Sequence, residues 1–190
     1  MNAKKHLGQH FLTSQKALFD MVEAGNIHID DLVLEIGPGK GVLTERLLPL
    51  AGKVIAIEKD NELIPLLKEK FAKEIESGKL DLVEQDILTF DPSLLRQGLS
   101  GYKLIANIPY YITGAIIEQF LSSMNQPRSM VLLIQKEVAE RIIARDQKSG
   151  NLGGKQSILS IAVSVYGVPR IVAKVPAGAF FPPPKVDSAI

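Results

Sequence analysis

Four consecutive residues in the middle of the chain, Asn107-Ile108-Pro109-Tyr110, carry groups suited to chemistry on an amino group. An aromatic amine is a poor nucleophile because its lone pair is delocalised into the ring. The side-chain oxygen of Asn107 and the backbone carbonyl of Ile108 or Pro109 could accept its two protons. The ring of Tyr110 offers a stacking surface for a flat base. These residue types favour catalysis by positioning and electrostatics, without a strong general base.

A glycine turn and two later acids indicate a nucleotide site. The spacing of Gly37, Gly39 and Gly41 is GxGxG, which is close to the dinucleotide fingerprint but does not match it, and no Lys-Ser/Thr pair makes it a P-loop. Glu58 ends the next expected strand, where doubly wound folds place the carboxylate that binds ribose hydroxyls. Asp86 ends the third strand and could accept from an adenine amino group. The alternatives are a tight turn with a surface acid at Glu58, and a helix cap or solvated acid at Asp86.

The elements that must position these residues alternate along most of the chain. Continuous apolar runs predict strands at 32–36, 53–58, 80–84, 102–106 and 130–134. Amphipathic spacing predicts helices at 15–25 (with Ser14 as its cap), 42–50, 63–76, 114–124 and 136–144. Apolar strands joined by helical crossovers predict an α/β doubly wound fold with a mostly parallel sheet.

The pattern changes after residue 144. Residues 146–155 are rich in glycine and polar side chains, and we expect them to be mobile. Residues 158–165 and 171–175 are predicted to be successive strands that form an antiparallel edge. Residues 180–190 contain three prolines and then begin another apolar strand, so we expect this chain to be a truncated piece of a longer protein.

Composition and charge exclude several classes of protein. The chain has no cysteine, which excludes disulfides, zinc–thiolate sites and thiol nucleophiles, and fits a reducing compartment. It has no run of 18 apolar residues, so no transmembrane helix is expected, and its polar, basic start does not resemble a secretory signal. Lysines and arginines outnumber acids at 1–19 and 128–155, whereas residues 58–91 are acidic. A basic rim can bind a polyanion, although solvated helix faces are the simpler interpretation.

Four short motifs occur together in a characteristic order: LGQHFL at 7–12, EIGPGKGVLT at 35–44, NIPYYIT at 107–113 and FFPPPKVDS at 180–188. Together they resemble the KsgA-type ribosomal RNA adenine dimethyltransferases. The resemblance implies a Rossmann-like catalytic domain over residues 1–190, with residues 1–13 as an N-terminal arm. It also implies that the helical C-terminal domain of this family is absent.

The resemblance further implies S-adenosylmethionine as the cofactor. The expected reaction is dimethylation of two adjacent adenosines in a hairpin near the 3′ end of small-subunit ribosomal RNA, during ribosome biogenesis. The expected partner is this RNA within the immature small subunit. A cytoplasmic monomer, without membrane association or a bound metal, is expected.

Roles for individual residues follow from the matching motifs. His10 and Leu12 would line the cofactor site from the arm, with Gly37 and Gly39 in the turn beneath the methionine part. Glu58 would bind the ribose, Asp86 the adenine amine, and Asn107 would lie at the reaction centre with Pro109. Phe180 would be a second stacking aromatic, opposite Tyr110.

Three alternatives stay open at this point. An Erm-type enzyme that methylates large-subunit ribosomal RNA shares the fold and the Asn107 motif. A non-catalytic assembly or transcription factor could retain the fold, although intact Glu58 and Asp86 disfavour it. An NAD-dependent oxidoreductase is disfavoured by the glycine spacing.

Overall fold

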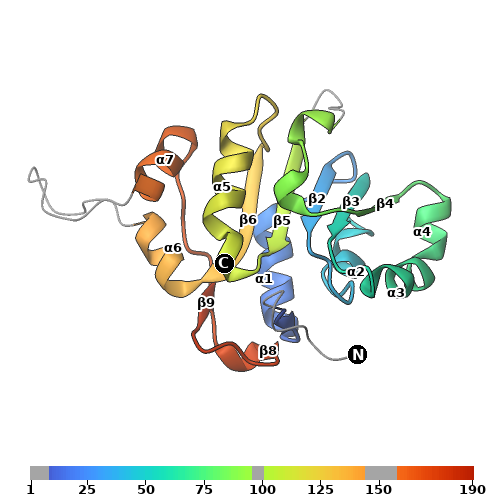
Figure 1. Cartoon of the computed structure of the whole chain (residues 1–190), viewed down its shortest axis with the longest axis horizontal. Coiled ribbons are helices and arrows are strands. Elements are labelled where there is room, and N and C mark those ends of the chain that lie inside the picture. Colours follow the sequence, from blue (N-terminus) through green and yellow to red (C-terminus); the bar gives the residue numbers. More distant parts are fainter. Residues whose placement is uncertain (1–8, 96–100, 144–157) are drawn as a thin grey trace, which may run out of the picture.

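A seven-stranded sheet runs through the middle of the molecule (Figure 1). The computed structural model describes residues 9–95, 101–143 and 158–190. The strand order is β4-β3-β2-β5-β6-β9-β7, and the five strands from β4 to β6 are parallel. The strands are β2 (Leu32–Ile36), β3 (Lys53–Glu58), β4 (Leu80–Glu84), β5 (Tyr102–Asn107), β6 (Ser129–Gln135), β7 (Lys174–Val175) and β9 (Ser188–Ala189).

Helices cover both faces of this sheet because successive strand residues point to opposite sides. Val33 packs with α1 and its neighbours, whereas the adjacent Leu34 packs with α5 and α6. The first face is covered by α1 (Gln15–Gly25), α2 (Thr44–Leu47), α3 (Leu63–Lys70) and α4 (Ala72–Glu76). The second is covered by α5 (Thr113–Ser122), α6 (Lys136–Ile143) and α7 (Ile158–Tyr166). The α/β doubly wound prediction is therefore confirmed.

The five predicted strands of the parallel sheet are confirmed to within one residue at either end. The cap of α1 is also as predicted, since the Ser14 side chain accepts from the backbone N–H of Ala17 at 3.2 Å. Two helix predictions were too long. The helix expected at 42–50 is only α2, and the one expected at 63–76 is interrupted at Phe71, whose ring packs beneath Gly41.

The prediction of a strand at 158–165 was wrong, because this segment is helix α7. A short run of apolar, β-branched residues has no clear period, so contacts with α5 and α6 decide its conformation. Within 171–175, only Lys174 and Val175 are in a strand. The antiparallel edge exists, but β9 forms it by pairing with both β6 and β7. The mobility predicted for 146–155 concerns residues outside the described ranges.

A separate two-stranded ribbon joins the start of the described chain to the FFPPP segment. β1 (Phe11–Leu12) pairs antiparallel with β8 (Phe180–Phe181), and Figure 1 shows β8 beside the blue start of the chain. The ribbon continues into a 3₁₀ turn, where Thr13 donates from both its backbone and its side chain to Ala179. Within the described ranges, no helix is both long enough and apolar enough to cross a lipid bilayer.

Candidate active site

A cavity of about 350 Å³ opens beyond the carboxyl ends of the parallel strands. The strand order reverses between β2 and β5, and doubly wound folds bind ligands at such a point. The cavity is lined by the residues that the sequence singled out: His10, Leu12, Gly37, Gly39, Glu58, Asp86, Asn107, Pro109, Tyr110 and Phe180. Residues more than a hundred positions apart therefore meet at one place.

The glycine turn and Glu58 form one hydrogen-bonded unit. One carboxylate oxygen of Glu58 accepts from the backbone N–H of Gly39 at 3.0 Å, and the other accepts from the N–H of Asp60 at 2.8 Å. Glu58 is buried, not the surface acid of the simpler interpretation, and burial raises its pKa despite these hydrogen bonds. Gly37 has φ 65°, and a Cβ there would meet no atom of the described residues within 4 Å. The turn thus leaves space where its backbone faces the cavity.

Glu35 contributes another carboxyl group to the cavity. It lies at the end of β2 and is 1% exposed, and among the described residues its Oε2 has no hydrogen-bond partner. Burial raises its pKa to about 8, which the nearby Thr44 only partly offsets and the Glu58 carboxyl reinforces. The sequence interpretation missed Glu35, although its position two residues before Gly37 of the glycine turn was a signal.

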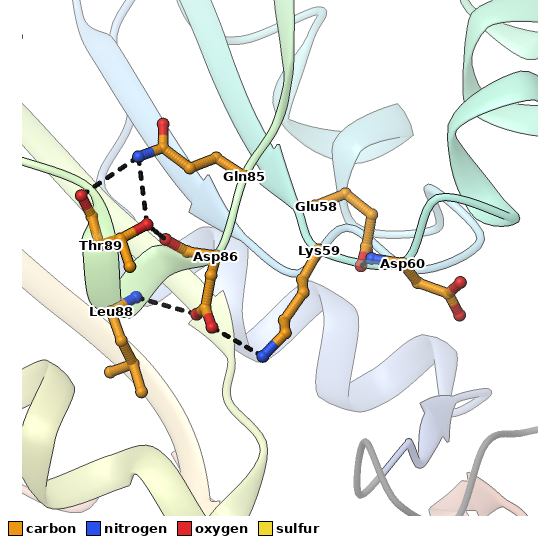
Figure 2. Close-up of polar contacts among 7 residues, drawn as sticks. All are labelled: Glu58, Lys59, Asp60, Gln85, Asp86, Leu88 and Thr89. Carbon is orange, nitrogen blue, oxygen red and sulfur yellow. Dashed lines mark hydrogen bonds and ion pairs between the residues drawn. The ribbon is translucent and has the colours of Figure 1, made fainter.

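Asp86 also lines the cavity, and its carboxylate is held by two contacts. Its Oδ1 accepts from the backbone N–H of Leu88 at 3.0 Å, which caps the 3₁₀ turn η2 (Ile87–Thr89), and its Oδ2 accepts from Lys59 at 2.6 Å (Figure 2). The Lys59 ammonium lowers the pKa of Asp86, and the pair raises the pKa of Lys59. Asp86 therefore caps a helical turn, as the alternative interpretation expected, and it also lines the cavity.

Asn107 ends β5, and its side-chain N–H donates to the backbone carbonyl of His10 at 3.2 Å. This contact uses the donor end of the amide and leaves the oxygen as the acceptor. The carbonyl of Pro109 accepts from the N–H of Ile112 at 3.2 Å, within the turn η4 (Tyr110–Ile112). Among the described residues, the carbonyl of Ile108 accepts no turn hydrogen bond, so both of its lone pairs stay available to a ligand.

The Tyr110 ring faces His10 in this structure. The two rings are stacked, with centroids 6.0 Å apart and planes at 23°. The Tyr110 hydroxyl bonds to Ser188 at 2.7 Å, and burial raises the pKa of the phenol. His10 is fixed by its Nδ1, which donates to the carbonyl of Pro182 at 2.7 Å. The rings of Tyr110 and His10 thus form one wall of the cavity.

Phe180 and Phe181 differ sharply in burial although they are neighbours. Phe180 lines the cavity but is 3% exposed, with its side chain packed in the core beside Leu12. Phe181 pairs with Phe11 across the ribbon and is 67% exposed. A base-stacking role for Phe180 stays a prediction, and the burial of its ring leaves little of it open to such a contact.

The N-terminal arm supplies more contacts than the sequence predicted. Gln9 donates to the carboxylate of Asp60 at 2.7 Å, and the ammonium of Lys40 lies 4.8 Å above the ring of Phe11. Both contacts tie the arm to loops that border the cavity. Gln9, Phe11 and Lys59 were missed because their partners are distant in sequence. Across the described residues, no three His, Cys, Asp or Glu side chains are placed to hold a metal ion.

The sheet order, the antiparallel β9 and the cavity at the switch point define a Rossmann-like methyltransferase fold. The sequence profile of the ribosomal RNA adenine dimethylase family matches residues 1–190. The chain belongs to this family.

Relatives support this assignment. The chain is 47% identical to ribosomal RNA small subunit methyltransferase A of Dehalococcoides mccartyi strain BAV1, over 100% of this chain and 62% of that protein. It is 42% identical to the protein of the same name from Nostoc sp. PCC 7120, over 98% of this chain and 69% of that protein. The chain thus spans less than two thirds of the length of the first of these relatives.

Two solved structures share the fold closely. A dimethyladenosine transferase from Plasmodium falciparum superposes with a TM-score of 0.77 at 34% identity, over 95% of this chain and 61% of that one. The 23S ribosomal RNA methyltransferase ErmE superposes with a TM-score of 0.75 at 29% identity, over 94% and 67% of the two chains. The fold is therefore shared with a dimethyladenosine transferase and with a 23S ribosomal RNA methyltransferase.

Proposed function

We propose that this chain is the catalytic domain of an S-adenosylmethionine-dependent methyltransferase that dimethylates the exocyclic amine of two adjacent adenosines in small-subunit ribosomal RNA. The observation that carries the proposal is the meeting of Asn107 with the Gly39–Glu58 unit in one cavity. The acceptor oxygen of Asn107 suits an amine, and the glycine turn with Glu58 suits a nucleoside. A methyl donor that contains adenosine and an amine acceptor can share this site.

The residues present fit this cofactor. S-adenosylmethionine carries a positive sulfonium and an ammonium group, and three carboxyl groups line the cavity, those of Glu35, Glu58 and Asp86. The buried Oε2 of Glu35 has no hydrogen-bond partner among the described residues. The open space at Gly37 admits a ligand against the backbone. When bound, the cofactor supplies an electrophilic methyl group.

The chain's own residues orient the amine. The Asn107 oxygen and the Ile108 carbonyl would accept the two amine protons, which directs the nitrogen lone pair away from the ring plane. The hydrogen bond from Asn107 to the His10 carbonyl fixes the amide orientation. The Tyr110 ring would hold the extruded base by stacking. Such preorganised acceptors favour the transition state because they need not reorient during the reaction.

Ribosomal RNA of the small subunit is the proposed substrate because the curated relatives at 39–47% identity carry that name. The ErmE superposition makes large-subunit RNA the second candidate. We further propose that the chain acts as a cytoplasmic monomer on immature small subunits, on the adenosines of a hairpin near the 3′ end. Residues 1–13 would serve as an arm over the cofactor.

The test is transfer of labelled methyl groups to immature small subunits and to large subunits, both purified from a host that lacks the endogenous enzymes. Primer extension then locates the modified adenosines. We expect modification of small-subunit RNA, and none with Asn107→Ala. Modification of large-subunit RNA alone would support the second candidate. Calorimetry with S-adenosylmethionine separates the two parts of the proposal, because absence of binding at millimolar ligand would overturn the cofactor assignment.

A further inference from the structure

The side chain of Lys59 spans one edge of the cavity. Lys59 directly follows Glu58 at the end of β3, and its ammonium reaches Asp86 at the end of β4 (Figure 2). In the same view, Glu58 turns the other way, towards the backbone of Asp60. The lysine stem therefore crosses between the two acids that line this side of the cavity.

Two contacts fix the carboxylate of Asp86, and Lys59 makes one of them. The Leu88 N–H holds Oδ1 at 3.0 Å, and the lysine ammonium holds Oδ2 at 2.6 Å. With both oxygens engaged, the carboxylate plane has little freedom to rotate. Each oxygen has a second lone pair, so either can still accept a proton from a ligand. The lysine thus orients Asp86 without using up its acceptors.

The lysine stem is itself suited to contact with a flat ring. Its side chain is 53% exposed, so about half of it is covered by protein, and Asp86 holds the ammonium at the far end. Long cationic side chains commonly lay their methylene groups along apolar surfaces while the charged end keeps a polar partner. A ring held between Glu58 and Asp86 would lie against this stem.

We propose that Lys59 forms the outer wall of the subsite for the adenine ring of the cofactor and orients Asp86 toward the exocyclic amine of that ring. The inference rests on the proposed function, since it assumes a cofactor that contains adenosine. Lys59 is a positioning residue here, because it acts on the amine through Asp86.

The chain offers a matched control on the same two strands. Lys53 of β3 pairs with Asp81 of β4 at 2.7 Å, with side chains 43% and 47% exposed. This pair has the same residue types and a similar distance, but it lies near the opposite ends of the strands. Surface ion pairs of this kind contribute little to stability, so Lys53→Met and Lys59→Met should unfold at similar temperatures.

The experiment measures the affinity of S-adenosylhomocysteine and of S-inosylhomocysteine, which lacks the exocyclic amine, by calorimetry. We expect Lys59→Ala, which removes both stem and charge, to weaken S-adenosylhomocysteine binding about tenfold. Lys59→Met keeps most of the stem and should weaken it about threefold. In both variants the preference for the adenosyl compound should fall at least about threefold, whereas Lys53→Met should match the unmodified chain.

The outcomes separate the two claims. If the unmodified chain does not bind S-adenosylhomocysteine, the proposed function fails and this inference fails with it. If it binds and Lys59→Met keeps the full adenosyl preference, the inference alone is overturned. Tighter binding by Lys59→Met would also overturn it, because the lysine would then compete with the ligand for Asp86. A fall in the preference cannot come from general destabilisation, which would affect both ligands equally.

Discussion

Asn107 and His10 are 97 residues apart in the chain and are joined by a hydrogen bond of 3.2 Å from the asparagine side chain to the histidine carbonyl. The bond connects the end of β5 to the N-terminal arm. His10 in turn donates to Pro182, another 172 residues away. The side chain of Asn107 is thus oriented by the N-terminal arm, which is itself held by a residue near the other end of the chain.

Replacement of Asn107 by alanine should abolish methyl transfer while the affinity for S-adenosylmethionine stays within about tenfold, or roughly 1.4 kcal/mol. The variant loses the acceptor for the amine but leaves the Gly39–Glu58 contact intact. Labelled methyl transfer and calorimetry on the same preparation measure the two effects. Unchanged turnover would show that Asn107 does not contact the amine.

Replacement of Glu58 by glutamine should weaken S-adenosylmethionine binding by at least about tenfold. The amide can accept through only one of its two ends, whereas the carboxylate accepts from both Gly39 and Asp60. Replacement by alanine should weaken binding further. Glu84→Gln is the matched control, because Glu84 is the exposed register partner of Glu58 on β4. Equal affinities for the two glutamine variants would contradict a cofactor role for Glu58.

Glu35 predicts a specific dependence of stability on pH. Burial raises its pKa from 4.5 to about 8, so the folded state holds this proton more tightly than the unfolded chain. The protonated Glu35 carboxyl therefore stabilises the folded state in full below pH 4.5. This contribution to the free energy of unfolding is lost as the pH rises from there to about 8, at up to about 1.4 kcal/mol for each pH unit. Glu35→Gln cannot titrate, so this loss should be absent.

Urea unfolding at several pH values between 5 and 8.5 tests this effect of Glu35→Gln. The variant should gain stability relative to the unmodified chain as the pH rises, by a few kcal/mol across the range. If Glu35→Gln follows the pH curve of the unmodified chain instead, Glu35 has an ordinary pKa.

The Tyr110 ring and its hydroxyl should have separable roles. Tyr110→Phe loses the hydrogen bond to Ser188 but keeps the ring, so methyl transfer should stay within about threefold. Ser188→Ala removes the same bond from its other end and should behave alike. Tyr110→Ala should lower kcat/KM by about 10- to 100-fold, since stacking contributes roughly 1–3 kcal/mol per base. A comparable loss in Tyr110→Phe would assign the effect to the hydroxyl.

The two adjacent phenylalanines should respond differently to truncation. Phe180→Ala should reduce the free energy of unfolding by about 3–5 kcal/mol, because the ring is 3% exposed in the core. Phe181→Ala should cost less than about 1 kcal/mol, because its ring is 67% exposed. Chemical denaturation of both variants measures this contrast. Similar losses in both would contradict the difference in burial between the two rings.

Much of the fold was predictable because it is local. The five apolar strands, the Ser14 cap and the glycine turn each depend on neighbouring residues, and the structure confirms them. Strand ends also placed Glu58, Asp86 and Asn107 at one edge of the sheet, because parallel strands end on the same side. The sequence by itself therefore determined the fold class and the position of the cavity.

The tertiary structure decided what depends on contacts between distant segments. It made 158–166 a helix, since packing on α5 and α6 outweighs the strand preference of β-branched residues. It also buried Phe180 and exposed Phe181, because the pairing of β8 with β1 determines which of the two rings faces the core. It also oriented Asp86 through Lys59 and Asn107 through His10. No local pattern encodes these contacts, because their partners lie tens of residues away and meet only when the sheet has formed.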